Sequence, residues 1–347
     1  MSIIPDKQIQ EIKELLSVSR KIVITTHNNP DGDAVGSSVA MYHYLKQLGH
    51  QVTMVVPNMY PGFLAWIPGI KEMLVYDRQA AQVKHVLTES EVVFCLDFNA
   101  INRLGSVSDV IGRSSGKKIL IDHHIDPETD SFDHCISTVD ISSASELVYY
   151  FIVQSGHKNL INKEVSEALY AGIVTDTGSF SFSCNRKETW EVMADLIARG
   201  VDAQKLHRLI YDTFTEDRLR LLGFAIHKRM IVMDEFHAAL IYLTKSDLKR
   251  FHYKVGDTEG IVNYPLSMDK INLSILLTEK DKMIKMSFRS KGDFSVNELV
   301  RKHFNGGGHK NAAGGKSFTT VEKAIEEIKK VLPLYKDQLN YVLSYDS

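Results

Sequence analysis

The chain has 347 residues, of which 44% are hydrophobic and 24% are charged, and its formal net charge is −2. This length is typical of two domains. The nearly neutral charge excludes a general positive field for long nucleic acid, although a local cluster could still bind a short anion. The three cysteines form no Cys-x-x-Cys pair, which argues against a zinc ribbon or a thioredoxin-type site and is typical of a reducing compartment.

No segment has the character of a targeting or membrane signal. Residues 1–16 carry Asp, Lys and Glu throughout and lack the apolar run of a signal peptide. No apolar run elsewhere reaches the length that crosses a membrane. We therefore expect a cytoplasmic protein that does not bind a membrane.

Strands and helices alternate along the first two hundred residues. Apolar, β-branched runs predict strands at 21–26, 51–56, 91–96 and 118–121. Helical spacing predicts helices at 7–16, 33–49, 145–154, 164–174 and 188–198. This alternation predicts a mostly parallel sheet covered by helices on both faces.

The second part of the chain reads as a smaller α/β unit. Residues 202–227 form a charged helical stretch that we interpret as a connector. Strands are expected at 238–243, 272–277 and 283–288, followed by a Gly-rich segment at 305–315 and a helix at 321–331. The predicted organisation is thus a domain at 1–200, a helical linker at 201–229 and a second domain at 230–347.

Ligand-type side chains follow several of the predicted strands. The tripeptide Asp122-His123-His124 comes directly after the apolar run 118–121, Asp97 ends the strand before it, and Asp176 follows a helix. His27, Asp31 and Asp33 lie between the first strand and the next helix. The carboxyl ends of parallel strands are where open α/β sheets place their chemistry.

A plainer explanation exists for some of these residues. Asp31 could be a turn residue, Asp33 a helix N-cap and Asp176 a polar helix end. Taken together, however, the set contains many carboxylates, few imidazoles and no thiolate. Such a set suits Mn²⁺ or Mg²⁺, with Co²⁺ as an alternative, and argues against structural zinc. It also exceeds the needs of one ion, which favours two ions that activate a hydroxide for phosphoester or phosphoanhydride hydrolysis.

In chain order, the segments 28–34, Leu96-Asp97, Asp122-His123-His124 and 172–178 resemble the four motifs of the DHH phosphoesterase superfamily. The segment Gly306-Gly307-Gly308-His309 is similar to the signature of its DHHA1 substrate-binding domain. The resemblance spans nearly the whole chain. It implies a DHH catalytic domain at 1–200 and a DHHA1 domain at 230–347.

The resemblance also implies a role for each matching residue. His27 and Asp31 would hold the first Mn²⁺. Asp33, His123 and Asp176 would hold the second, and Asp97 would bridge both. His124 would not bind metal but would face the substrate phosphate as a hydrogen-bond donor or general acid, and Asp122 would orient a metal ligand from behind.

Within the superfamily, the chain resembles the stand-alone bacterial nanoRNases and pAp phosphatases. This implies a hydrolase, an exonuclease and oligoribonuclease that binds and cleaves short nucleic acid and removes the 3′-phosphate of pAp. A cyclic di-AMP or pApA phosphodiesterase is the alternative, and an inorganic pyrophosphatase or short-chain polyphosphatase is less favoured because it lacks the Gly-rich segment. A catalytically silent nucleotide-binding protein is disfavoured because no ligand is missing.

Candidate substrate-binding residues are Arg103, Arg289, Gly306, Gly307, Gly308 and His309. The glycines could form a nest of backbone N–H groups around a phosphate, and the arginines could bind one in bidentate fashion. The alternatives are a loop or a tight backbone crossing between helices for the glycines and a solvated strand-end charge for Arg289. Phe180 and Phe182, after Asp176, are explained more simply as buried aromatics than as residues that stack a base.

An apolar segment at 63–67, expected to be exposed, suits a homodimer contact. The sequence leaves open the preferred nucleotide, the direction of degradation, the metal used in the cell and the oligomeric state.

Overall fold

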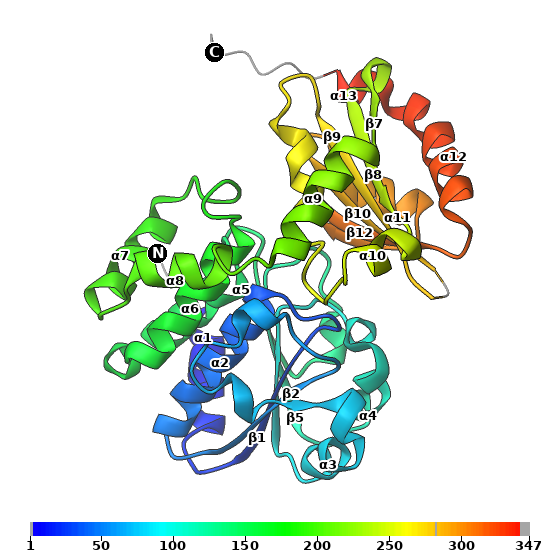
Figure 1. The fold of residues 1–347 in the computed structure, drawn as a ribbon. Coiled ribbons are helices and arrows are strands. Elements are labelled where there is room, and N and C mark those ends of the chain that lie inside the picture. Colours follow the sequence, from blue (N-terminus) through cyan, green and yellow to red (C-terminus); the bar gives the residue numbers. More distant parts are fainter. Residues whose placement is uncertain (1–2, 282, 341–347) are drawn as a thin grey trace. The chain divides into compact units, whose positions relative to one another are not determined.

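The computed structural model describes residues 3–281 and 283–340 and divides the chain into two compact units, residues 1–213 and 214–347 (Figure 1). Unit 1 and unit 2 each have their own sheet and their own hydrophobic core.

The sheet of unit 1 is parallel throughout. Its strands are β1 (Lys21–Thr26), β2 (Gln51–Val56), β3 (Leu74–Val75), β4 (Val92–Leu96), β5 (Lys117–Asp122) and β6 (His134–Ser137). They lie in the order β3-β2-β1-β4-β5-β6. The chain first adds β2 and β3 on one side of β1, then forms β4 on the other side of β1 and adds β5 and β6 beyond it. The two directions diverge between β1 and β4, which is the point where sheets of this kind bind ligands.

Helices cover both faces of this sheet, as the sequence predicts. They are α1 (Asp6–Leu15), α2 (Gly32–Gln47), α3 (Tyr76–Thr88), α4 (Ser108–Gly112), α5 (Ala144–Gln154), α6 (Lys163–Asp176), α7 (Lys187–Ala198) and α8 (Ala203–Tyr211). Successive strand residues point to opposite faces. Ile22 and Ile24 therefore pack into the core with α2, α5 and α6, whereas Val23 packs with α3 and α4 on the other face.

Two glycines allow α2 and α6 to pack closely. A Cβ atom on Gly36 would lie 2.6 Å from the carbonyl oxygen of Ala168 and 2.8 Å from the backbone nitrogen of Gly172. A Cβ on Gly172 would lie 1.9 Å from the hydroxyl of Ser145 on α5. Side chains at these positions would push the three helices apart.

Unit 2 contains a mixed sheet in the order β11-β12-β10-β9-β8-β7, in which only the β8–β9 pair is parallel within the described residues. The strands are β7 (Met230–Met233), β8 (Ala238–Leu243), β9 (Leu273–Glu279), β10 (Ile284–Ser290), β11 (Gly307–His309) and β12 (Ala312–Ser317). The helices are α9 (Glu216–Lys228), α10 (Lys245–Arg250), α11 (Val296–His303), α12 (Val321–Val331) and α13 (Lys336–Leu339). The α/β architecture predicted for this part is confirmed.

The helical stretch expected at 202–227 consists of two helices, α8 and α9. Helix α8 ends at Tyr211, and α9 begins after Thr215, whose side chain accepts a hydrogen bond from the backbone N–H of Arg218. This N-cap starts a new helix, which the charge pattern did not reveal. The division between the two units falls in this interruption.

One expectation about the surface was wrong. The segment 63–67 is not an exposed apolar stretch, because Leu64 and Ile67 are buried and Phe63 and Trp66 pack against the same core. Its 3-10 turn (Gly62–Leu64) directs these side chains inward, which an apolar run alone does not predict. The homodimer itself stays a prediction.

Among the described residues, no helix is both long and apolar enough to cross a membrane.

We predict that Gly36→Ala destabilises unit 1 by about 1–3 kcal/mol, because the new methyl group overpacks the contact between α2 and α6. Gly223, in α9, is the matched control, because a Cβ there would meet nothing within 4 Å. Gly223→Ala should stabilise its helix by about 0.5–1 kcal/mol. Calorimetric unfolding of both variants checks this, and equal stability of the Gly36→Ala variant and the parent protein would contradict the packing argument.

Candidate active site

Three neighbouring strands deliver the candidate site residues to one edge of the sheet in unit 1. Thr26 pairs in register with Leu96, and Leu96 pairs with Ile121. The residues that directly follow these three are His27, Asp97 and Asp122. The register of β1, β4 and β5 therefore places an imidazole and two carboxylates side by side at the point where the strand order diverges.

Asp97 lies at the centre of the cluster and is buried. Its Oδ2 atom is 3.5 Å from Nε2 of His27, and its Oδ1 atom is 3.3 Å from Nε2 of His123. Its backbone has a φ of 63°, a left-handed conformation that an Asp adopts more readily than most residues. Each carboxylate oxygen thus faces a different histidine.

His27 and Asp31 form one side of the cluster. The Nδ1 atom of His27 lies 3.0 Å from the carbonyl oxygen of Asn28, so the opposite atom, Nε2, faces the carboxylates. This Nε2 is 3.8 Å from Oδ1 of Asp31. Asp31 is the N-cap of α2 and accepts hydrogen bonds from the backbone N–H groups of Asp33 and Ala34. The helix cap that we considered for Asp33 therefore belongs to Asp31.

Asp33 is held from behind by the first turn of α5. Its two oxygens accept hydrogen bonds from the backbone N–H groups of Ala144, at 2.7 Å, and Ser145, at 2.9 Å. A helix N-terminus favours a negative charge. Gly32 precedes Asp33 for a steric reason, because a Cβ there would collide with the side chain of Thr175.

His123 joins the other side of the cluster. Its Nε2 atom lies 3.6 Å from Oδ2 of Asp33 and 3.6 Å from Oδ2 of Asp176, in addition to its contact with Asp97. Asp176 is the last residue of α6 and is partly exposed. The C-terminal end of α6 thus closes the cluster from the helix side.

Asp122 holds His124, whereas we expected it to orient a metal ligand. The Nδ1 atom of His124 is 2.7 Å from Oδ1 of Asp122, whose Oδ2 accepts the backbone N–H of His124 at 3.1 Å. Asp122 is completely buried. A contact between the His124 ring and a substrate would therefore involve Nε2.

The buried charges perturb one another strongly. Burial, followed by the charges of Asp97 and Asp176, raises the pKa of Asp33 well above its usual range. Burial would lower the pKa of His123, but the Asp176, Asp97 and Asp33 carboxylates outweigh it and raise this pKa to about 10. Burial opposes the ionisation of Asp97, yet His123 and His27 hold its pKa far below the usual value. Such opposed shifts in one cluster are typical of functional sites.

The arrangement fits divalent ions. The groups His27–Asp31–Asp97 and Asp33–Asp97–His123 each bring their ligand atoms within 4.8 Å of one another, and Asp97 belongs to both. Within the described residues, Oδ1 of Asp97 is buried and accepts no hydrogen bond, although buried carboxylate oxygens normally do. A third group, Asp97–Asp122–His124, is better explained by the hydrogen-bonded pair Asp122–His124.

The substrate-binding candidates lie on separate elements. The backbone carbonyl of Arg103, in a 3-10 helix (Ile101–Val107), accepts the N–H of Asn28 at 2.8 Å, which ties this helix to the loop after His27. Arg289 lies on β10, where its guanidinium donates to the carbonyl of Phe288. His309 lies on β11 and is partly exposed. Arg103 is in unit 1, whereas Arg289 and His309 are in unit 2.

The Gly-rich segment forms a β-hairpin of β11 and β12, not the loop between helices that was one alternative for it. Gly307 and Gly308 pair with Gly314 and Ala313. A Cβ on Gly306 would lie 1.9 Å from the carbonyl oxygen of Gly314. This glycine is therefore needed for close approach of the two strands.

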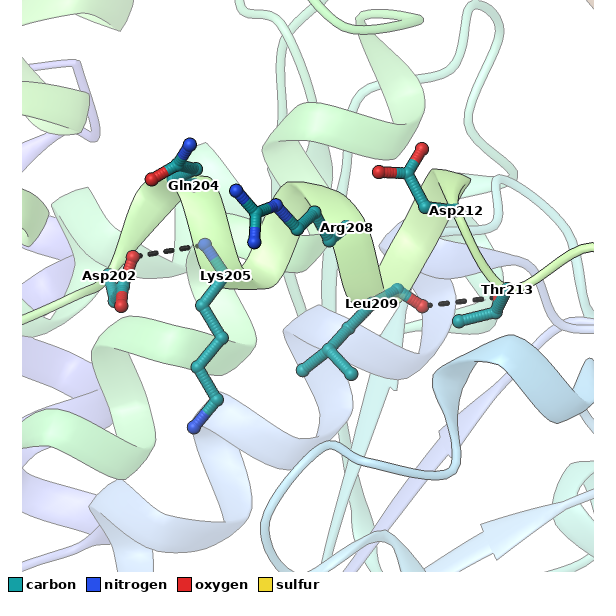
Figure 2. A pocket seen from close by; sticks show the side chains of 7 residues that line it. All are labelled: Asp202, Gln204, Lys205, Arg208, Leu209, Asp212 and Thr213. Carbon is teal, nitrogen blue, oxygen red and sulfur yellow. Dashed lines mark hydrogen bonds between the residues drawn. The ribbon is translucent and has the colours of Figure 1, made fainter.

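A hollow beside α8 does not contain the cluster. It has a volume of ≈ 430 Å³ and is lined by Asp202, Gln204, Lys205, Arg208, Leu209, Asp212 and Thr213, on and beside α8 (Figure 2). None of these residues is a candidate ligand. The buried charges of the His–Asp cluster therefore indicate the position of a catalytic site better than this hollow does.

Sequence reasoning missed the residues that support Asp33. Ser143 is the N-cap of α5, and Glu146 three residues later is buried and accepts hydrogen bonds from Ser142 and from Thr189 on α7. The Ser-x-x-Glu spacing is a helix-start signal that could have located this turn. The hydrogen bond between Ala144 and Asp33 could not be inferred from spacing, because the two residues are 111 positions apart in the chain.

Models of known families match both units. A model of the DHH family, N-terminal domain, matches residues 21–173, and a model of the DHHA1 domain matches residues 239–334. Among solved structures, the chain is similar to an exopolyphosphatase-related protein from Bacteroides fragilis, with 41% sequence identity and a TM-score of 0.93. This match covers 98% of the chain and 100% of the B. fragilis chain.

Two curated relatives match at comparable lengths. The chain is 28% identical over 316 residues to a Streptococcus mutans protein named probable bifunctional oligoribonuclease and PAP phosphatase NrnA. It is 27% identical over 315 residues to the Bacillus subtilis protein named bifunctional oligoribonuclease and PAP phosphatase NrnA. Both matches cover 90% of this chain and 94% of the relative.

We predict that divalent metal stabilises unit 1, because it relieves repulsion among Asp33, Asp97 and Asp176. Mn²⁺ at a hundred times its dissociation constant should add about 2.7 kcal/mol of apparent stability. Asp97→Asn should remove most of this gain, since it weakens both groups at once. Calorimetry with and without Mn²⁺ measures the gain, and Asp130→Asn, which changes an exposed carboxylate, is the control. Equal gains in both variants would contradict the assignment.

Proposed function

Because the chain belongs to the DHH family of phosphoesterases and carries its DHH and DHHA1 domains, we propose that it hydrolyses phosphoester bonds in short nucleotides. The substrates would be very short oligoribonucleotides and the 3′-phosphate of pAp. The observation that carries the proposal is the pair of ligand groups that share Asp97. The names of the S. mutans and B. subtilis relatives, which match nearly their whole length, support the substrate class.

Six side chains would hold two Mn²⁺ ions. His27 and Asp31 would bind the first, Asp33, His123 and Asp176 the second, and Asp97 would bridge both. Four carboxylates, two imidazoles and no thiolate favour Mn²⁺, with Mg²⁺ or Co²⁺ as alternatives. When bound, two such ions activate water and neutralise charge on the phosphoryl group.

Within the protein, the chemistry would fall to His124. Asp122 fixes its ring through Nδ1, so Nε2 is the atom that would donate a proton or a hydrogen bond to the substrate phosphate. Because Asp122 accepts the hydrogen bond from Nδ1–H, donation from Nε2 requires the imidazolium form of the ring, in which both nitrogens carry a proton. Asp122 is therefore a positioning residue, and His124 is the catalytic one.

Short substrates agree with the charge of the chain. A protein that tracks long nucleic acid contacts many phosphates with Lys and Arg, whereas the net charge here is −2. Arg103, Arg289, His309 and the hairpin glycines Gly306, Gly307 and Gly308 are proposed to bind the few phosphates of a short substrate. The three cysteines form no disulfide, which supports a cytoplasmic location as part of the proposal.

We expect Mn²⁺-dependent turnover of pAp and of dinucleotides, measured in a panel with pApA, cyclic di-AMP and pyrophosphate. Asp97→Ala should abolish turnover while its far-ultraviolet circular dichroism stays unchanged. Cyclic di-AMP or pApA as the preferred substrate would replace the proposal by the cyclic dinucleotide alternative. Preferred turnover of pyrophosphate, or full activity of Asp97→Ala, would contradict it.

Asp122→Asn should lower kcat by about tenfold to a hundredfold, because the His124 ring loses its charged partner. His124→Ala should lower kcat by about 10²–10⁴-fold. Mn²⁺ affinity should stay nearly constant in both, whereas His123→Ala should weaken it. Steady-state kinetics across pH and calorimetric metal titration separate these effects, and loss of metal binding in His124→Ala would show that His124 is a ligand.

A further inference from the structure

The segment directly after Asp176 has an unusual backbone. Four of its residues, Gly178, Ser179, Phe180 and Ser183, have positive φ angles of 54°, 56°, 63° and 48°. Three of them are not glycine, and such conformations cost free energy that the surrounding structure must supply. Strained segments of this kind are common at functional sites. A function for residues 178–183, in addition to reversing the chain direction, would explain the strain.

Hydrogen bonds to the end of α6 hold this segment in place. The N–H of Ser179 donates to the carbonyl of Val174 at 2.8 Å. The N–H of Phe180 donates to the hydroxyl of Thr177 at 3.1 Å, and that of Phe182 donates to the carbonyl of Thr177 at 3.0 Å. Thr177 is buried and follows Asp176 directly. The segment and the carboxylate are thus fixed to the same helix end.

This fixed backbone leaves the ring of Phe182 exposed, whereas Phe180 packs against the core. The side chain of Phe182 is 40% exposed, which contradicts our expectation of a buried aromatic. Its ring lies over Gly178, since a Cβ there would come within 2.8 Å of ring carbons. Phe180 stacks on Trp190 with 4.6 Å between ring centroids and an interplanar angle of 28°. The indole N–H of Trp190 donates to the carbonyl of Cys184, which braces the segment from α7.

Resting on the proposed function, we propose that Phe182 stacks against a nucleobase of the substrate, and that the Phe180–Trp190 pair supports the segment that carries it. Its anchor to the end of α6 fixes the ring relative to the carboxylate of Asp176. A phenyl ring offers no hydrogen-bonding group, so it would accept any base. The strain in residues 178–183 is then the cost of presenting an apolar ring to solvent on a segment that follows Asp176 directly.

The test compares a dinucleotide with an analogue in which tetrahydrofuran spacers replace both bases. Phe182→Ala should raise the KM and the dissociation constant of the dinucleotide by about tenfold to a hundredfold, the usual effect of losing one stacked base. Phe182→Trp should stay within about threefold of the parent protein. The spacer analogue should show the same KM with all three proteins. Phe318→Ala, at a Phe that is 68% exposed in unit 2, is the control.

The outcomes separate this inference from the proposed function. Binding of the dinucleotide that depends on Phe182, without hydrolysis, would support the stacking role and contradict the proposed function. Hydrolysis with unchanged KM and affinity in Phe182→Ala would overturn the stacking role alone. An equal loss for the dinucleotide and the spacer analogue, together with a lower molar mass by light scattering, would assign Phe182 to a contact between copies and overturn it too.

Discussion

The buried carboxylate of Asp97, placed between His27 and His123, is the constraint on which the rest of unit 1 depends. A carboxylate cannot be buried cheaply without partners, and here two other carboxylates, Asp33 and Asp176, approach the same point. Histidines balance part of this charge, and the parallel register of three strands fixes where they meet. Several carboxylates can lie this close together because their arrangement suits a cation, which would offset the repulsion among them.

Close helix packing serves this arrangement. Gly36 lets α2 approach α6, and Gly172 lets α6 approach α5, whose first turn reaches Asp33 with two backbone N–H groups. Gly172 is placed so that a side chain there would meet both Ser145 and the Asp33 carboxylate. Packing and electrostatics are therefore not separable here, since the same contact between helices that fills the core also orients a candidate ligand.

The sequence predicted four of the six strands of unit 1 closely because β1, β2, β4 and β5 are short apolar runs, but it missed β3, which has two residues, and β6, which is half-buried and partly polar. The runs that end before His27, Asp97 and His123 each led directly to the site. The support of Asp33 by α5 was not predictable, because it joins segments more than a hundred residues apart.

Three other failures share a cause. The hairpin at β11 and β12 was hidden because glycine has no preference for strands, the inward turn of 63–67 depends on a local 3-10 geometry, and the exposure of Phe182 depends on rare backbone angles. In each case the backbone conformation determines the structure, and the residue types of the segment give little information about that conformation.

The register that aligns β1, β4 and β5 also has a consequence for the order of folding. The candidate ligands extend from His27 to Asp176, and the sheet pairs β1 with β4 across two intervening strands. Such nonlocal pairing forms late relative to local helices. A nascent chain would therefore gather the whole set only after α6 has been synthesised and has packed on the sheet. High-affinity capture of metal would then mark a completed DHH domain, and partly folded chains would be poor competitors for the cell's supply of the ion.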